Sequence, residues 1–84
     1  MVLATELAAQ GITVNSVLPG PIETTMLGQL FDGNPDDFED MFVQRTPMGR
    51  IGQAQEVADV VAFLAGNDAR WVTGQNLRVD GGFR

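Results

Sequence analysis

The clearest repeat of apolar residues along the chain predicts a helix in its second half. Its members fall at positions i, i+3, i+4 and i+7, which places them on one face of an α-helix. They are Val57, Val60, Val61 and Leu64. The pattern predicts an amphipathic helix that begins at Gln53 or Ala54 and ends at Gly66.

A second helix is predicted near the N-terminus. Leu3 and Leu7 are four residues apart and form part of an apolar stripe over residues 1–10, with Gly11 in place as a C-terminal cap. No capping residue precedes Val2, so this helix is expected to be truncated at its start.

The middle of the chain is less regular. Thr24 and Thr25 are candidates to cap a short helix that ends at Leu30, and Asn34-Pro35 is typical of the start of another helix. Its first turns carry Asp36, Asp37, Glu39 and Asp40. Carboxylates are favoured near a helix N-terminus, so we interpret the cluster as a solvated helix start and not as a metal site.

Two β-rich segments complete the pattern. Residues 12–18 predict a strand that ends at Pro19-Gly20-Pro21, and residues 76–80 predict a strand closed by Gly81-Gly82. Residues 67–73 read as a turn or short helix between the long helix and the second strand. Strands joined by a helical crossover are expected to be parallel, so the predicted fold class is α/β.

Composition narrows the possible functions. The chain has 84 residues with 44% apolar and 19% charged residues, which is typical of one small globular domain at most. The net charge of −6 argues against nucleic acid and against anionic membranes as partners. With no Cys and no His, neither a disulfide nor a thiolate or imidazole metal site is expected. No apolar run predicts a membrane span, no signal peptide is evident, and the expected location is the cytoplasm.

Three stretches of the sequence resemble the short-chain dehydrogenase/reductase family. The first is ELAAQGITVNSVLPGPIET at residues 6–24, which is similar to the family's helix end, its G-I-x-V-N-x-V strand and its P-G-x-I-x-T turn. The second is TPMGRIG at residues 46–52, followed by EVA at 56–58. The third, TGQNLRVDGG at residues 73–82, resembles the family's closing T-G-Q-x-x-x-V-D-G-G.

The resemblance implies a partial Rossmann-type fold over residues 1–84, built from the last two parallel strands of the family's seven-stranded sheet and their crossover helices. It implies the C-terminal part of an oxidoreductase that moves a hydride between NAD or NADP and a carbonyl or hydroxyl carbon. The family's Tyr-x-x-x-Lys pair, its catalytic Ser and its Gly-rich phosphate loop have no counterpart here, and the chain contains neither Tyr nor Lys. We therefore expect no catalytic residue, no activity and no cofactor bound by this chain alone.

The resemblance also implies a cofactor site after the first strand. Its candidate residues are Pro19, Gly20, Pro21, Ile22 and Thr24. The resemblance implies that the Ile22 backbone binds the carboxamide of the nicotinamide. It also implies that the Thr24 hydroxyl binds either the carboxamide or the adjacent phosphate. The alternative is that Pro-Gly merely turns the chain and Thr24 merely caps a helix.

Two further expectations concern surfaces. Residues 25–50 match the family's variable substrate loop, whose apolar side chains either cover a small carbonyl or alcohol substrate or pack against the rest of a larger protein. The helix at 54–65 and the strand at 76–80 match a two-fold contact of many members, so a homo-oligomer is expected. An alternative function is a non-catalytic module that associates with a homologous subunit or a complementary fragment.

Three residues have structural interpretations. Asn15 is expected to bind backbone groups, Arg50 to make an ion pair or to hold loop carbonyls, and Trp71 to pack beneath the last strand. The first strand is also expected to keep one open edge.

Overall fold

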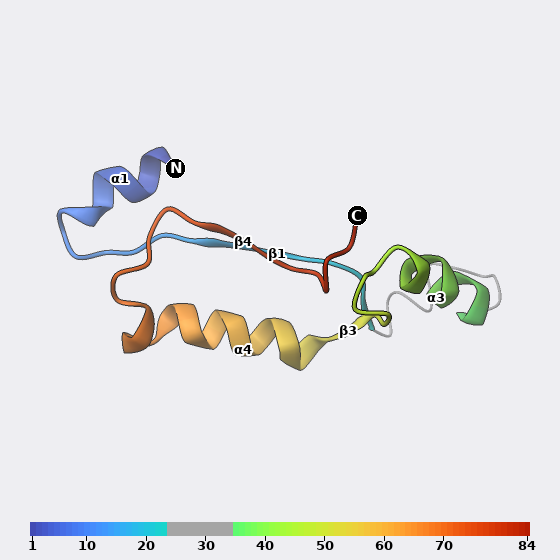
Figure 1. The fold of residues 1–84 in the computed structure, drawn as a ribbon. Coiled ribbons are helices and arrows are strands. Elements are labelled where there is room, and N and C mark those ends of the chain that lie inside the picture. The colour runs from blue at the N-terminus through green and yellow to red at the C-terminus, as the bar shows by residue number, and fades with distance from the viewer. Residues whose placement is uncertain (24–34) are drawn as a thin grey trace.

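The computed structural model describes residues 1–23 and 35–84 (Figure 1). In chain order the elements are α1 (Val2–Ala8), β1 (Ser16–Pro19), β2 (Ile22–Glu23), α3 (Pro35–Gln44), β3 (Gly52–Gln53), α4 (Ala54–Ala65), the 3-10 helix η1 (Asn67–Ala69) and β4 (Asn76–Val79). The predicted helices at 1–10, after Asn34-Pro35 and from Ala54, and both predicted strands, are confirmed. The helix proposed to begin at Thr24 or Thr25 lies outside the described residues.

The two main strands form a parallel pair. β1 and β4 align with Ser16 opposite Asn76 and Pro19 opposite Val79. In Figure 1, α4 runs alongside this pair, as expected for the crossover that returns the chain to a parallel strand. Within the described residues β1 pairs with β4 alone, so its other edge has no strand partner from that part of the chain. The predicted α/β class is confirmed.

β1 begins four residues later than the sequence predicted, because hydrogen bonds from side chains to the backbone take the place of strand-to-strand hydrogen bonds before Ser16. The Asn15 amide donates to the Val72 carbonyl oxygen at 3.1 Å and accepts the Gln75 N–H at 3.0 Å. The Thr73 hydroxyl accepts the Val14 N–H at 3.0 Å. These bonds satisfy the backbone locally and confirm the structural role expected for Asn15.

A left-handed glycine ends α1. Gly11 has a φ of 76°, its N–H donates to the Ala8 carbonyl at 3.0 Å, and the Ile12 N–H donates to the Leu7 carbonyl at 3.3 Å. This pair of bonds is the Schellman arrangement that terminates many helices, and it turns the chain into the extended approach to β1.

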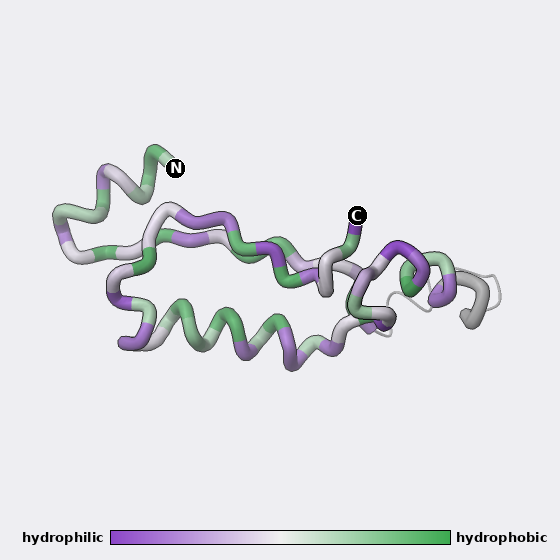
Figure 2. Tube along the Cα trace, in the orientation of Figure 1, coloured by the Kyte–Doolittle hydropathy of each residue, from purple (hydrophilic) through white to green (hydrophobic). Residues whose placement is uncertain are grey.

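α4 presents its apolar side to the strand pair. Val57, Val60 and Leu64 are half-buried, whereas Val61 is 49% exposed, so three of the four predicted positions face the interior of the fold. Figure 2 shows hydrophobic residues recurring along this helix. No helix among residues 1–23 and 35–84 has both the length and the apolar character needed to cross a bilayer.

A second, smaller parallel pair was not predicted. β2 and β3 pair with Ile22 opposite Gly52 and Glu23 opposite Gln53. Strands of two residues have no periodicity that a sequence pattern can reveal. The pair ties the segment after β1 to the residues immediately before α4.

The molecule is elongated. Its radius of gyration is 16.0 Å, against about 12 Å for a compact domain of this length. Only Ala4, Ile51 and Ala69 are buried apolar residues among those described. The expectation for Trp71 is wrong, because its side chain is 97% exposed. It lies just after η1 and lines an open hollow with Ala8, Ala9 and Ile12, so the residues that the structure describes leave its side chain uncovered.

We predict that Asn15→Leu destabilises the chain by about 1–3 kcal/mol, because it leaves the Gln75 N–H and the Val72 carbonyl without their partners. Urea unfolding followed by far-UV circular dichroism measures the effect. Gln44→Leu, at an exposed position on α3, is the matched control and should change the midpoint little. Equal effects of the two substitutions would contradict the role assigned to Asn15.

Candidate functional site

The segment that follows β1 lies directly against the turn that follows β4. The Gly20 N–H donates to the Val79 carbonyl at 3.0 Å. A Cβ added at Gly20 would lie 2.6 Å from the Asp80 Cβ and 2.8 Å from its Cα. Only glycine allows so close an approach. The parallel pairing therefore requires Gly20 at this position, where the turn after β1 meets the turn after β4 at the carboxyl ends of both strands. Ligands in open α/β sheets bind beyond this edge.

Asp80 organises the second turn. Its carboxylate accepts the Gly82 N–H at 2.9 Å and lies 3.2 Å from the Arg78 Nε and 3.4 Å from the Arg84 guanidinium. The side chain is only 10% exposed, so the two arginines balance a nearly buried charge and the Gly82 N–H adds a hydrogen bond to it. The end of the second strand predicted at Gly81-Gly82 is confirmed, since β4 ends at Val79 and Gly81 and Gly82 have φ values of 61° and 88°.

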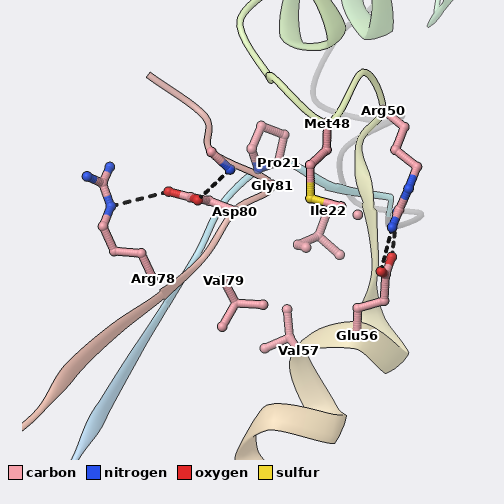
Figure 3. A pocket seen from close by; sticks show the side chains of 12 residues that line it. Pro21, Ile22, Met48, Arg50, Glu56, Val57, Arg78, Val79, Asp80 and Gly81 are labelled. Atoms are coloured by element: carbon pink, nitrogen blue, oxygen red, sulfur yellow. Dashed lines mark hydrogen bonds and ion pairs between the residues drawn. The ribbon is translucent and has the colours of Figure 1, made fainter.

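A cleft of about 320 Å³ opens beside these turns, between the strand pair and the start of α4 (Figure 3). Small-molecule sites typically enclose about 300–1,000 Å³, so its volume is at the low end of that range. Its apolar lining includes Pro21, Ile22, Met48, Val57 and Val79, and its polar lining includes Arg50, Glu56, Arg78 and Asp80.

A second hollow of about 340 Å³ lies against the same segment and is lined by Leu18, Pro19, Gly20, Pro21, Phe42, Arg78, Asp80 and Phe83. Pro21 lines both hollows, and Ile22 lines the first only. The structure thus places Pro19, Gly20, Pro21 and Ile22 together between two open spaces. Thr24, the fifth candidate, lies outside the described residues.

An ion pair closes one wall of the cleft. The Arg50 guanidinium bonds both carboxylate oxygens of Glu56, at 2.6 and 2.7 Å, and Gln53 N–H donates to the same carboxylate at 3.0 Å. The Arg50 hydrogen bond, and then the Gln53 N–H, lower the pKa of Glu56 from 4.5 to about 2. The same hydrogen bond raises the pKa of Arg50. The ion pair expected for Arg50 is confirmed, and it holds the loop before α4 to the first turn of that helix.

The chemistry available at this edge is that of binding and orientation. No group of three or more potential metal ligands occurs in the described parts of the chain. The groups at hand are backbone amides of two turns, apolar side chains and two arginines whose charges are already paired. Such a set can hold the amide and ring of a flat cofactor.

Comparison with known proteins agrees with this geometry. Residues 1–84 match the family model described as enoyl-(acyl carrier protein) reductase. The chain is 49% identical over 80 residues to the 3-oxoacyl-[acyl-carrier-protein] reductase FabG of Escherichia coli, covering 95% of this chain and 31% of FabG. It is 44% identical over 82 residues to a chloroplastic NADPH-dependent aldehyde reductase-like protein of Arabidopsis thaliana, covering 98% of this chain and 29% of that protein.

Solved structures give the same result. The crystal structure of a 3-oxoacyl-[acyl-carrier protein] reductase from Brucella melitensis superposes with a TM-score of 0.87 at 40% identity, over 98% of this chain and 29% of that one. A Brucella melitensis reductase of the same name with bound NAD gives a TM-score of 0.82 at 39% identity, over 98% and 28% of the two chains. The fold is therefore a partial Rossmann-type unit, and the chain belongs to the short-chain dehydrogenase/reductase family. It spans about three tenths of the length of these relatives.

Two features of the site were not identified from the sequence. No role was predicted for the Asp80 carboxylate, and the contact between Gly20 and Asp80 was not foreseen. The signals were present as Gly20 after one strand and Asp80 after the other. Their contact depends on the register of β1 and β4, which no local pattern contains.

We predict that Gly20→Ala displaces the Asp80 turn, because the new methyl group overlaps the Asp80 Cβ and Cα. Overpacking of this kind costs about 1–3 kcal/mol. Hydrogen exchange should show faster exchange at the Gly82 amide, which Asp80 holds. Gly11→Ala is the comparison, since an added Cβ there meets nothing within 4 Å and its φ of 76° lies at the end of α1, far along the chain from the Gly82 turn. Unchanged exchange at Gly82 in Gly20→Ala would refute the predicted clash.

We predict that acid weakens the start of α4. The pKa of Glu56 is lower in the folded chain, so its ionised form stabilises the fold fully above about pH 4.5. That contribution falls as the pH drops from 4.5 and is gone below about 2. Helical circular dichroism in denaturant, measured from pH 2 to 7, should show this loss, and Glu56→Gln should flatten it. Glu6→Gln, an exposed change on α1, should leave the pH profile as in the parent chain.

Proposed function

We propose that these 84 residues form the C-terminal segment of an NAD(P)-dependent reductase that transfers a hydride to the carbonyl carbon of a small substrate. The observation that carries the proposal is the meeting of the Gly20 and Asp80 turns beyond the carboxyl ends of β1 and β4, beside an open cleft. Relatives with this fold are reductases, and one was crystallised with NAD.

In this proposal Pro19, Gly20, Pro21 and Ile22 lie against the nicotinamide end of the cofactor, with Thr24 as a further contact. The cofactor supplies the hydride when bound. The close approach of Gly20 to Asp80 fixes the path of the segment, and the Gly52 N–H, which donates to the Pro21 carbonyl at 2.9 Å, holds it from the other side. A segment held at both sides presents its backbone amides in one orientation, which favours one face of the ring.

Proton transfer belongs to another part of such an enzyme. The chain contains no Tyr, Lys, His or Cys, and its five basic residues are all Arg, which do not release a proton at neutral pH. Reduction of a carbonyl requires a proton for the new hydroxyl group. We therefore propose that this chain binds and orients and is inactive without the remainder of the fold.

Residues 25–50 would cover the substrate in this proposal. The part that the structure describes includes Phe42, which lines the hollow beside Pro19 and Gly20, and Met48, which lines the cleft. Apolar side chains on both sides of the nicotinamide segment suit a substrate with an aliphatic portion. A homo-oligomer formed through the helix at 54–65 and the strand at 76–80, and a location in the cytoplasm, remain parts of the same proposal.

A second candidate is a module that associates with a complementary fragment or a homologous subunit. Its support is the extended shape, with three buried apolar residues among those described, while Trp71, Phe63 and Leu18 are 97%, 48% and 46% exposed. Size-exclusion chromatography after co-expression with the remaining, N-terminal part of Escherichia coli FabG tests this second candidate. Co-elution as a complex would support the module, and separate elution would count against it.

A chimera tests the principal proposal. We predict that Escherichia coli FabG whose aligned segment is replaced by these 84 residues oxidises NADPH or NADH in the presence of a 3-oxoacyl thioester. The 84-residue chain alone should show no turnover and no NAD(P)H binding by calorimetry. A folded chimera that binds neither cofactor would overturn the proposal, and so would turnover by the isolated chain. Native FabG is the positive control.

A further inference from the structure

The last residues of the chain run along the C-terminal end of α3. The Arg84 N–H donates to the Arg45 carbonyl at 3.1 Å, and the Arg45 Nε donates to the main-chain oxygen of Arg84 at 2.8 Å. Arg45 follows α3 immediately, so two reciprocal bonds join the end of that helix to residues 39 positions later in the chain.

Aromatic contacts reinforce the same junction. The rings of Phe42 and Phe83 lie 5.8 Å apart at 51°, and the Arg45 guanidinium lies 5.2 Å from the centre of the Phe83 ring. Tilted aromatic pairs and cation–π contacts are both attractive at these separations. Arg45 therefore contacts the tail with its guanidinium in two ways, through a hydrogen bond and through a ring face.

The glycines of the tail are packed on the loop after α3. A Cβ at Gly81 would lie 3.0 Å from the Thr46 Cγ2, and one at Gly82 would lie 3.1 Å from the Pro47 Cγ. The Met48 N–H donates to the Gly81 carbonyl at 3.1 Å. Thr46 itself is buried at 4% exposure and donates its hydroxyl to the Phe42 carbonyl at 2.6 Å.

The other end of the tail is Asp80, which lies against Gly20. The Phe83 N–H donates to the Asp80 carbonyl at 3.0 Å, and the Arg84 guanidinium reaches the Asp80 carboxylate at 3.4 Å. A continuous set of contacts thus runs from residues 19–22, which are proposed to lie against the nicotinamide, through Asp80 and the rest of the tail (residues 80–84) to Arg45 and Phe42.

We propose that residues 80–84 act as a strap that sets where the C-terminal end of α3 lies relative to the turns after β1 and β4, and that Arg45 and Phe83 are its positioning residues. This inference rests on the proposed function, because α3 belongs to the segment proposed to cover the substrate. Loss of the strap should loosen the substrate side of the site and leave the cofactor side in place, since the bonds that hold Gly20 and Pro21 involve neither residue.

Hydrogen exchange on the 84-residue chain tests the strap without any activity. Arg45→Gln removes the guanidinium bond to Arg84 and the contact with the Phe83 ring. Loss of one charge-assisted hydrogen bond corresponds to about a tenfold change, so the Arg84 and Met48 amides should exchange about tenfold faster. Arg70→Gln is the matched control, because Arg70 also donates to a carbonyl, that of Asn67 at 3.0 Å, but beyond the opposite end of α4. In Arg70→Gln, the Arg84 and Met48 amides should exchange at the same rate as in the parent chain.

Kinetics in the FabG chimera tests the effect on the site. Arg45→Gln and Phe83→Leu should each raise the KM for the 3-oxoacyl thioester about tenfold, with the KM for the nicotinamide cofactor changed less than twofold. Arg45→Lys, which keeps a charged donor, should recover part of the loss. A purely structural role would lower Tm or kcat without this split between substrates, and that result would overturn the proposal.

The two experiments separate the inference from the proposed function. A chimera without turnover would refute the function, whereas the exchange measurement would still decide whether the strap exists. Unchanged exchange at Arg84 and Met48 in Arg45→Gln, with the chain folded, would refute the strap whatever the chimera does.

Discussion

The parallel pairing of β1 with β4 is the constraint on which the rest of this structure depends. The four aligned residues of each strand place Pro19 opposite Val79. Gly20 and Asp80, the first residues after the two strands, therefore meet at a distance that only glycine permits. Asn15 fixes the register from the other end by bonding both Val72 and Gln75. A shift by one residue would separate the two turns and turn the apolar side chains of β4 away from α4.

Charged and polar side chains then hold the crossover in place. Arg50 and Glu56 tie the loop before α4 to its first turn, and Gln53 bonds Glu23 across the short β2–β3 pair at 2.9 Å. These contacts are largely exposed, so each contributes modestly to stability, yet together they fix where α4 begins. The cleft lies between that point and the strand ends, so its shape is set by polar contacts as much as by the apolar lining.

Apolar burial contributes less than is usual for a chain of this length. α4 covers the pair from one side, while Leu18, Leu77 and Trp71 remain 46%, 38% and 97% exposed. With only Ala4, Ile51 and Ala69 buried among the described apolar residues, the driving force for folding from apolar burial is small. This is the physical basis for proposing that the unit works within a larger assembly of the same family, whose members are about three times as long.

Local patterns in the sequence determined the type and order of the longer elements, but not the short β2–β3 pair. Helical spacing from Val57 to Leu64 predicted α4, Gly11 predicted the end of α1, and the Pro-Gly turn after residue 18 predicted the end of β1, because each depends on neighbours in the chain. Motif resemblance also predicted a cofactor site at Pro19, Gly20, Pro21 and Ile22, which stays a prediction. What only the tertiary structure decided are the contacts between distant residues: Gly20 on Asp80, Asn15 between Val72 and Gln75, and Arg45 on the tail. Trp71 illustrates the same limit, since its exposure depends on which surfaces the fold brings near it and not on its hydrophobicity.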